Sequence, residues 1–394
     1  MPAPNIGHME ATAKISAKGL ARLEDGHLWV YRSDVTQANA GAGEMVRVLD
    51  HRGRFAGRAF YSDKSQITLR FLTREDVPTD EVFFRARLQA AADYRGLVVR
   101  ETECYRLVHG EGDLLPSIII DRYGEYFVVQ TLSQGAETLK PLLVKLLAEM
   151  FSPRGILERN DPRVRQREGL AQQTTVLRGE VPARVRAKMN GLEWELDLHH
   201  GQKTGAFLDQ RENYRAAAQY ASGEALDCFT YQGGFGLTMA RNCQSVELVD
   251  LSEEALAQAR RNAEANSITN VSFRTGNTFD VLKQYDEAGR RFDTIVLDPP
   301  AFAKDRASVE AALRGYKEIN LRSLKLLRPG GKLITCSCSH HVAEHMFLGV
   351  IAEAASDTGK FLRIIERSTQ SKDHAILLTV PETLYIKCLI FNML

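Results

Sequence analysis

The sequence predicts an α/β protein with a doubly wound parallel sheet in its C-terminal part, preceded by a small β-barrel and an α+β connector. Three observations lead to this prediction. In the second half, short apolar runs alternate with segments of helical period, which is typical of a parallel sheet covered by helices. Strand-like runs separated by Gly and Asp turns open the chain, and helices mix with strands in between. The predicted domains span residues 1–75, 76–188 and 189–394.

The N-terminal region has the features of a small barrel that binds RNA. Its strand-like runs lie at 45–49, 55–61 and 67–71. Basic and aromatic side chains occur together here, and such residues hold RNA through its backbone and by stacking on its bases. We therefore expect Arg22 and Arg32 to contact RNA, close to the aromatic side chains of Trp29 and Tyr31.

The connector and the C-terminal sheet follow in chain order. The connector is expected to contain helices at 82–95 and 139–150 and strands at 117–121 and 126–131. A strand-like run at 192–198 leads into the C-terminal region. The predicted strands of the parallel sheet lie at 225–229, 245–250, 271–275, 294–298 and 332–336, with helical segments at 252–266 and 309–327 among them.

Three motifs fall at the ends of these strands. They are the glycine loop at 231–236, the Asp-Pro-Pro step at 298–300 and the Cys-Ser-Cys step at 336–338. Ligands of such sheets bind beyond the carboxyl ends of the strands, so the three motifs are expected to converge on one crevice. A carboxylate on a rigid turn, together with a thiol, suits chemistry on a planar nucleobase.

The glycine loop and the acidic residue after it indicate a nucleotide-like ligand. Glycines let the backbone approach a ligand closely, which suits either a dinucleotide pyrophosphate or the methionine part of S-adenosylmethionine. The spacing is Gly-Gly-x-Gly instead of the dinucleotide pattern Gly-x-Gly-x-x-Gly. Asp250 closes the next strand, where its carboxylate can accept from both hydroxyls of a ribose. A dehydrogenase has no need of the Asp-Pro-Pro step or of the thiol.

Composition is that of a large intracellular enzyme with an uneven charge distribution. The chain has 394 residues, of which 44% are hydrophobic, so more than one domain is expected. Six scattered cysteines fit a reducing compartment, and no apolar run is long enough to span a bilayer, so the predicted location is the cytoplasm. The cysteines and histidines show no spacing typical of a zinc site. The net charge is only +1, but basic residues exceed acidic ones in 1–74 and 154–188, where they can neutralise phosphates.

Several blocks of the sequence resemble the bacterial and archaeal large-subunit ribosomal RNA cytosine-C5 methyltransferases. The blocks are Gly201-Gln202-Lys203-Thr204-Gly205 through 207–213, the loop segment 226–235, Asp298-Pro299-Pro300-Ala301-Phe302, and Ser337-Cys338-Ser339. The first seventy residues are also similar to the PUA domain of that family. The resemblance implies a class I methyltransferase fold, S-adenosylmethionine as methyl donor, large-subunit ribosomal RNA as partner and, in some members, a homodimer.

The resemblance also implies roles for individual residues. The expected residues of the S-adenosylmethionine site are Lys203, Thr204, Phe207, Asp227, Tyr231, Gly233, Gly234, Asp250, Asn277 and Asp298. The expected contacts to the RNA substrate are Pro299, Pro300, Phe302, Arg22 and Arg32. Asn277 stands where the family has an Asp that accepts from the adenine amino group, and its amide oxygen can accept with less charge assistance.

Cytosine C5 is a poor nucleophile, and a thiolate that adds at C6 makes it reactive by forming a covalent intermediate. An unperturbed thiol is only about 3% ionised at neutral pH, so the site has to favour the thiolate. Asp298 can hold the N3/N4 edge of the base. Cys336 and Cys338 would share one face of a strand, so periodicity does not separate them. The family pattern Ser-Cys-Ser favours Cys338 as the nucleophile, with Cys336 as the alternative.

One departure and three rival functions stay open. The two-cysteine cytosine methyltransferases carry a second cysteine where this chain has Ala301, so the base that removes the C5 proton is not identified. Adenine amino-methyltransferases place an aromatic residue directly after the second Pro, which is absent here. A ribosomal RNA guanine methyltransferase shares the fold and the Asp-Pro-Pro step but needs no thiol. The third rival is a non-catalytic RNA-binding assembly factor. The modified nucleotide, the form of the RNA substrate and the oligomeric state do not follow from the sequence.

Overall fold

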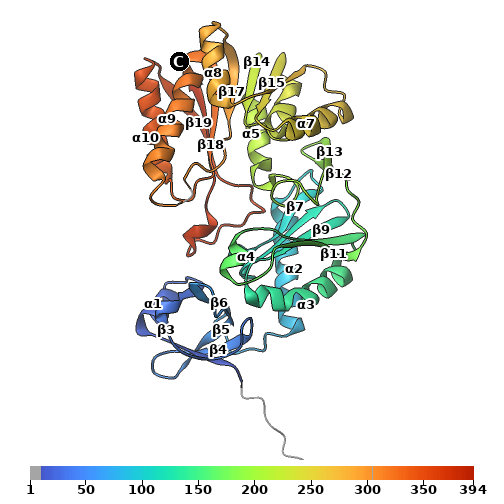
Figure 1. Cartoon of the computed structure of the whole chain (residues 1–394), viewed down its shortest axis with the longest axis vertical. Coiled ribbons are helices and arrows are strands. Elements are labelled where there is room, and N and C mark those ends of the chain that lie inside the picture. The colour runs from blue at the N-terminus through green and yellow to red at the C-terminus, as the bar shows by residue number, and fades with distance from the viewer. Residues whose placement is uncertain (1–9, 304) are drawn as a thin grey trace, which may run out of the picture.

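The computed structural model describes residues 10–303 and 305–394, which form three sheets stacked along the long axis of the molecule with a small hairpin between the second and third (Figure 1). The barrel lies at one end, the connector in the middle, and the large sheet at the other end. The predicted α/β class, with a barrel and an α+β connector before a doubly wound sheet, is confirmed. No helix of the described ranges is long and apolar enough to cross a membrane.

The barrel is a rolled six-stranded sheet in the order β2-β6-β5-β4-β1-β3. Its elements are β1 (Thr12–Ile15), α1 (Ala17–Glu24), β2 (Trp29–Tyr31), η1 (Arg32–Asp34), β3 (Val35–Asn39), β4 (Met45–Leu49), β5 (Phe55–Tyr61) and β6 (Ile67–Thr73). Alternating residues of β4 point inward, and Val46 and Val48 are buried with Ile15 and Leu69 in a core of its own. The strand-like runs expected at 45–49, 55–61 and 67–71 therefore form strands.

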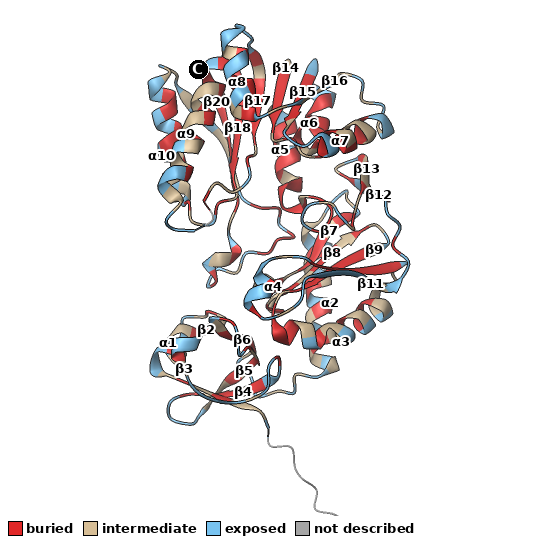
Figure 2. Cartoon of the chain, viewed as in Figure 1, coloured by how far each residue is buried: buried red, intermediate tan, exposed pale blue. Residues whose placement is uncertain are grey.

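The connector is a five-stranded sheet in the order β11-β10-β9-β8-β7. Its elements are α2 (Glu81–Val98), β7 (Cys104–His109), η2 (Gly110–Asp113), β8 (Ile118–Tyr123), β9 (Tyr126–Thr131), α3 (Gln134–Phe151), β10 (Gly155–Asn160), α4 (Val164–Arg167) and β11 (Gln173–Gly179). Asp80 and Ser133 begin α2 and α3 by accepting from backbone N–H groups of the first turn. Phe84 and Leu143 of these helices are buried in one cluster with residues of the sheet. Figure 2 shows the central strand β9 of this sheet as buried. A hairpin of β12 (Val185–Met189) and β13 (Leu192–Leu196) follows.

The large sheet has the order β16-β15-β14-β17-β18-β20-β19. Its elements are η3 (Leu208–Gln210), α5 (Arg211–Tyr220), β14 (Glu224–Cys228), α6 (Gly234–Met239), η4 (Ala240–Asn242), β15 (Ser245–Asp250), α7 (Glu253–Ala265), β16 (Val271–Thr275), α8 (Thr278–Glu287), β17 (Phe292–Leu297), α9 (Val309–Leu326), β18 (Leu327–Ser337), α10 (Glu344–Asp357), β19 (Leu362–Ser368), η5 (Pro381–Thr383) and β20 (Lys387–Met393). Strands β14 to β18 run parallel, whereas β20 is antiparallel to both of its neighbours. Two apolar clusters cover the two faces of the sheet.

A buried hydrogen bond and a buried ion pair join the three units. Asp373, between β19 and β20, forms an ion pair with Arg211 at 3.2 Å and accepts from the backbone N–H of Arg106 in the connector. On the other side of the connector, Glu168 binds Arg70 of the barrel at 2.7 Å, with both side chains almost fully buried. Charges buried in this way need their partners, so the contact of Asp373 with the connector and the Glu168–Arg70 pair fix how the units sit against one another.

Glu168→Ala is expected to weaken the packing of the barrel against the connector and to lower the free energy of unfolding. The substitution leaves the guanidinium of Arg70 buried without its carboxylate, and breaking a buried pair in this way costs about 3–5 kcal/mol. The measurement is urea unfolding of the full chain followed by circular dichroism. Glu149→Ala is the control, because Glu149 pairs with Arg85 at an exposed site, where such pairs contribute about 0–1 kcal/mol. Equal losses for the two variants would contradict this account.

Candidate active site at the carboxyl edge of the parallel sheet

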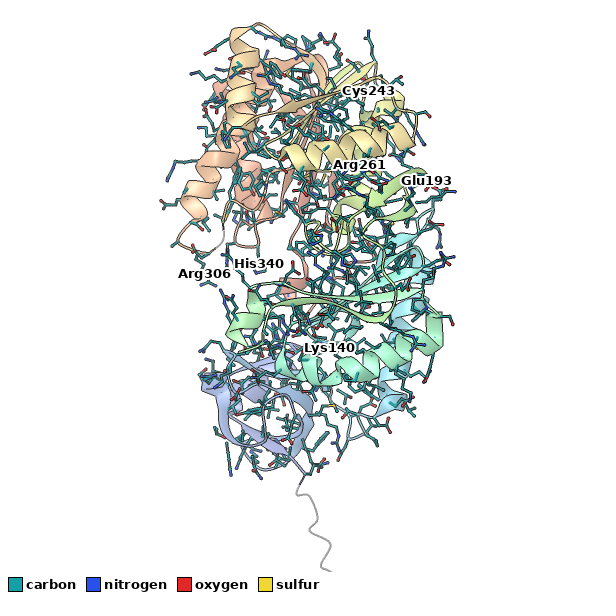
Figure 3. All side chains as sticks on the ribbon, turned by 45° about the vertical axis from the view of Figure 1, so that its right-hand side comes forward. Lys140, Glu193, Cys243, Arg261, Arg306 and His340 are labelled. Atoms are coloured by element: carbon teal, nitrogen blue, oxygen red, sulfur yellow. The ribbon has the colours of Figure 1, made fainter. Side chains whose placement is uncertain are left out.

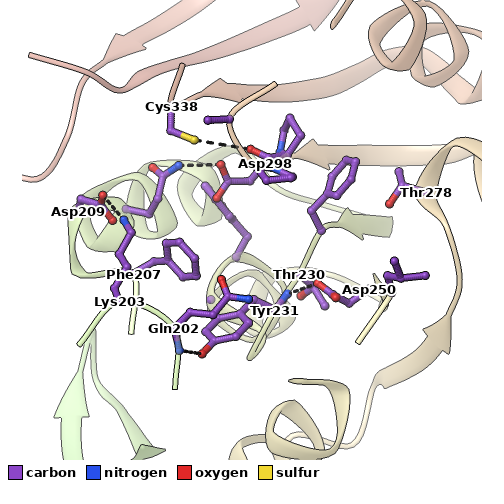
Figure 4. Close-up of a pocket in the computed structure, with 18 of the residues that line it drawn as sticks. Gln202, Lys203, Phe207, Asp209, Thr230, Tyr231, Asp250, Thr278, Asp298 and Cys338 are labelled. Carbon is purple, nitrogen blue, oxygen red and sulfur yellow. Dashed lines mark hydrogen bonds and ion pairs between the residues drawn. The ribbon is translucent and has the colours of Figure 1, made fainter. Parts of the chain in front are cut away.

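A cavity of about 560 Å³ lies beyond the carboxyl ends of β14, β15, β17 and β18. Figure 4 shows Tyr231 and Asp250 on one side of it and Asp298 and Cys338 on the other. The cavity brings together ten of the residues singled out from the sequence, which are Lys203, Phe207, Tyr231, Gly234, Asp250, Asn277, Asp298, Pro299, Pro300 and Cys338. The three motifs at the strand ends therefore meet in one place.

The glycine loop turns sharply at the end of β14. Phe229, Tyr231 and Gly233 all have positive φ, and the backbone of Tyr231 donates to Asp250 over 2.8 Å. A Cβ at Gly234 would overlap the ring of Tyr214, so the loop can lie this close to α5 only with glycine at that position. The backbone of the loop therefore forms one wall of the cavity.

Asp227 supports this loop from beneath and does not line the cavity. Its carboxylate accepts from the backbone N–H of Gly236 at 2.7 Å and from the hydroxyl of Thr230. Burial raises the pKa of Asp227 to about 7. Because a carboxylate hydrogen-bonded to the loop backbone resists displacement, Asp227 fixes the shape of the loop.

Asp250 ends β15 with its carboxylate at the cavity. One oxygen accepts from the backbone of Tyr231 and the other accepts from the backbone of Ser252 over 2.9 Å. Each carboxylate oxygen has a second lone pair, so the group can still accept from two hydroxyls of a ligand. The exposed side chain of Leu251 follows directly and lines the same cavity.

Asn277 lines the cavity at the start of α8. Its amide oxygen accepts from the backbone N–H of Phe279 over 2.9 Å and thereby caps the helix. Phe279 and Leu251 offer apolar surface on this side of the cavity. One lone pair of the Asn277 oxygen is used for the cap, so the expected contact to an adenine amino group relies on the other.

Asp298 is held by a chain of amide hydrogen bonds. Gln210 donates to Asp298 Oδ1 over 2.9 Å, and Asn213 in turn donates to the side-chain oxygen of Gln210 over 2.6 Å. Burial, and next the negative charge of Asp209, raise the pKa of Asp298 to about 7. At neutral pH this carboxyl group therefore exists in both protonation states, which suits a group that exchanges a proton with a ligand.

Asp209 forms the floor of the same region. Lys203 makes an ion pair with it, and Tyr385 donates to its Oδ2 over 2.9 Å. Burial disfavours the charged form of Asp209. Lys203 and other cationic neighbours together outweigh this effect and lower the pKa of Asp209 to about 2. The ammonium of Lys203 also lies 4.4 Å from the centre of the Phe207 ring. This arrangement fixes the 201–207 segment over the cavity.

The two candidate cysteines differ in position. Cys338 lines the cavity, and its Sγ lies 3.8 Å from the carbonyl oxygen of Pro299. Burial, and next the charge of Asp298, raise the pKa of this thiol to about 11. Cys336 is fully buried opposite Cys388 and does not line the cavity. Only Cys338 has its sulfur where a ligand in this cavity can meet it.

Other residues expected at the site lie outside the cavity lining. Thr204 is buried and hydrogen-bonds the hydroxyl of Tyr123 at 2.8 Å, and Phe302 packs on the ring of Tyr316. Gly233 belongs to the glycine loop but is also outside the lining. In the barrel, Arg32 donates to the carbonyl oxygens of Asp63 and Ser65, and Arg22 donates to the hydroxyl of Tyr31. No group of three potential metal ligands occurs among the residues of the described ranges.

Several lining residues were not singled out from the sequence as site residues. They include Asp209, Gln210, Thr278, Phe279, Tyr385 and Ile386. Asp209 and Gln210 lie within the motif at 207–213, so that motif was the available signal for them. Tyr385 and Ile386 belong to the segment between β19 and β20, which carries no recognisable motif.

Comparisons with known proteins agree with this geometry. A model of the PUA-like domain matches residues 13–74, and a model of S-adenosylmethionine-dependent methyltransferases matches residues 165–382. The ribosomal RNA large subunit methyltransferase I of Tolumonas auensis is 41% identical over 92% of this chain and 94% of its own length. The protein of the same name from Klebsiella pneumoniae is 38% identical, over 95% and 96%.

Solved structures share the fold over nearly the whole chain. A putative S-adenosylmethionine-dependent methyltransferase from Streptococcus mutans has a TM-score of 0.82 at 20% identity, covering 98% of this chain and 100% of that one. A putative methyltransferase complexed with S-adenosylhomocysteine has a TM-score of 0.84 at 20% identity, with the same coverage. At this level of identity the likeness concerns the fold.

Asp298→Asn is expected to change how stability depends on pH. Between pH 3.8 and about 7 the folded protein keeps the proton on Asp298 that the unfolded chain releases. The stabilisation from this proton is complete below pH 3.8 and is lost as the pH rises through 7. The melting temperature of Asp298→Asn should therefore rise relative to the wild type between pH 4 and pH 7. Asp280→Asn, at an exposed position, should follow the wild type, and parallel curves for all three proteins would contradict the raised pKa.

Proposed function

The chain belongs to the S-adenosylmethionine-dependent methyltransferases, and we propose that it methylates C5 of a cytosine in large-subunit ribosomal RNA through a covalent bond to Cys338. The observation that carries the proposal is the position of the Cys338 thiol, which lines one cavity together with Asp298 and the glycine loop. A methyltransferase that acts on an exposed nitrogen atom needs no thiol at this place.

The choice of RNA rests on the relatives and on the barrel. Relatives named as ribosomal RNA large subunit methyltransferase I match this chain over almost its whole length. The PUA-like barrel and the excess of basic residues at 154–188 offer surfaces for phosphates and bases. Both features support large-subunit ribosomal RNA as the substrate.

The residues around the glycine loop fit the methyl donor. Gly234 allows the close backbone approach that the methionine part requires, and the free lone pairs of Asp250 suit the ribose hydroxyls. Phe279 and Leu251 provide the apolar surface for the adenine ring. When bound, S-adenosylmethionine supplies an electrophilic methyl group on a sulfonium.

Cys338 and Asp298 would act on the base. The thiolate of Cys338 adds to C6, and the electron pair of the C5=C6 bond moves to C5, which can then accept the methyl group. Asp298, with its pKa near 7, holds the N3/N4 edge and favours protonation of N3 as the adduct forms. Loss of the C5 proton to a base returns the electron pair, breaks the Sγ–C6 bond and restores the thiolate, and the proton on N3 returns to Asp298. One proton leaves for each methyl group transferred.

Asp250→Ala is expected to weaken binding of the demethylated donor, S-adenosylhomocysteine. Losing charge-assisted hydrogen bonds to the ribose should cost about 1.5–3 kcal/mol, or roughly tenfold to a hundredfold in affinity. Isothermal titration calorimetry on the full chain measures this loss. Glu264→Ala, an exposed position on α7, should bind as the wild type does. An unchanged affinity of Asp250→Ala would remove this residue from the donor site.

Cys338→Ser is expected to abolish covalent trapping of a modified RNA. An enzyme that attacks C6 of 5-fluorocytosine cannot lose fluorine as a cation, so it stays bound and shifts on a denaturing gel. The wild type and Cys336→Ser should form this adduct, whereas Cys338→Ser should form none. Trapping that survives in Cys338→Ser but disappears in Cys336→Ser would transfer the role to Cys336. If the wild type methylates the unmodified RNA but forms no adduct, the guanine reaction becomes the better account.

A further inference from the structure

Lys387 is a buried lysine that the reaction outlined above does not use. It is only 8% exposed, and its ammonium donates to the carbonyl oxygens of Ser339 at 2.7 Å and Tyr385 at 3.1 Å. Within the described ranges, no carboxylate lies within 4.0 Å of this ammonium. Burying an ammonium group without a counter-charge costs folding free energy. The presence of Lys387 at this position therefore points to a chemical role.

The ammonium is fixed close to the proposed nucleophile. Lys387 begins β20 directly opposite Ser337, the last residue of β18, and Cys338 follows Ser337 immediately beyond the end of that strand. The chain after Cys338 is rigid, because the Ser339 hydroxyl hydrogen-bonds Tyr316 at 3.0 Å and accepts from the backbone of Ala303. Since Lys387 donates to the carbonyl of Ser339, its charge keeps a constant place relative to the thiol.

The charges that surround the thiol leave it short of a cation. Asp298 and Asp209 both disfavour the thiolate of Cys338. Lys203 favours the thiolate, but its ammonium is already paired with Asp209. The Cys338 sulfur, which has to become negative, therefore faces two carboxyl groups and one lysine whose positive charge is already balanced by Asp209.

The groups that face Lys387 are Cys338, Glu344 and His340. Burial lowers the pKa of Lys387 to about 8, while the negative forms of Cys338 and Glu344 raise it. Burial also lowers the pKa of His340, and the cations of His341 and Lys387 lower it further, so His340 does not add a competing charge at neutral pH. Figure 3 shows His340 at the end of the large-sheet domain that faces the connector. Lys387 is thus charged at neutral pH and responds to the charge on Cys338.

We propose that Lys387 is a positioning residue whose ammonium charge stabilises the thiolate of Cys338 and so prepares it to attack C6. This inference rests on the proposed function. The thiol proton leaves to solvent and Lys387 keeps its three protons, so the step changes only the charge on sulfur. The new anion then supplies the counter-charge that the buried ammonium lacks, and the Sγ–C6 bond forms from the sulfur lone pair.

The test is the pH dependence with which iodoacetamide alkylates Cys338 in the full chain, followed by peptide mass analysis. Lys387→Gln should make the reaction roughly tenfold slower at pH 7, where the wild-type ammonium is charged, and the difference from the wild type should shrink above pH 8 as Lys387 loses its proton. Lys387→Arg should restore most of the rate, because it keeps the charge. The control is Lys332→Gln, which removes a lysine of β18 that also donates to a backbone carbonyl. Its alkylation rate should equal that of the wild type.

Two outcomes overturn the inference. One is a Lys387→Gln profile equal to that of the wild type. The other is a Lys387→Arg profile as slow as that of Lys387→Gln although both proteins melt at the wild-type temperature, because this result indicates a packing role. If Lys387→Gln does not fold, Lys387→Met provides the same comparison with a side chain of similar length. The assay uses neither RNA nor donor, so it is independent of the adduct assay. An adduct with 5-fluorocytosine RNA together with unchanged alkylation would reject only the role of Lys387.

Discussion

The cavity depends on the buried carboxylate of Asp209. Its Oδ2 holds the ammonium of Lys203 from the 201–207 segment and the hydroxyl of Tyr385 from the C-terminal segment, and its backbone oxygen accepts from Ser371 at 2.7 Å. Segments far apart in the chain are thereby drawn to one point at the edge of the sheet. The same negative charge helps to raise the pKa of Asp298. One buried anion thus shapes the cavity and adjusts its chemistry, at a desolvation cost that its cationic partners offset.

The electrostatics of the site divide into two halves. Around the glycine loop, Asp227 and Asp250 bind backbone N–H groups and so arrange donors and acceptors for a neutral or weakly charged part of a ligand. At the other end, the charges of Asp298, Asp209 and Lys203 act on the ionisation of the Cys338 thiol. Burial alone makes that thiol a poor acid, so the arrangement of nearby charges decides whether it can react.

The sequence predicted the positions of the parallel strands along the chain and the meeting of the three motifs, because apolar periodicity and strand ends follow directly from residue order. It did not predict β19 and β20. Strand β20 pairs antiparallel with both β18 and β19, and its pairing with β18 brings Tyr385 to the cavity and Lys387 close to it from a distant part of the chain. Thr204, expected at the cavity from its motif, is instead turned toward Tyr123 of the connector. Such choices depend on long-range packing, which a local pattern does not encode.

The proposed target atom of the methyl group is C5 of a cytosine. The most direct measurement uses large-subunit ribosomal RNA labelled with tritium at C5 of its cytosines, and compares tritium released to water with methyl groups transferred. The account predicts one tritium released for each methyl group, since C5 must lose its hydrogen to regain the double bond. Methyl transfer without tritium release would contradict it.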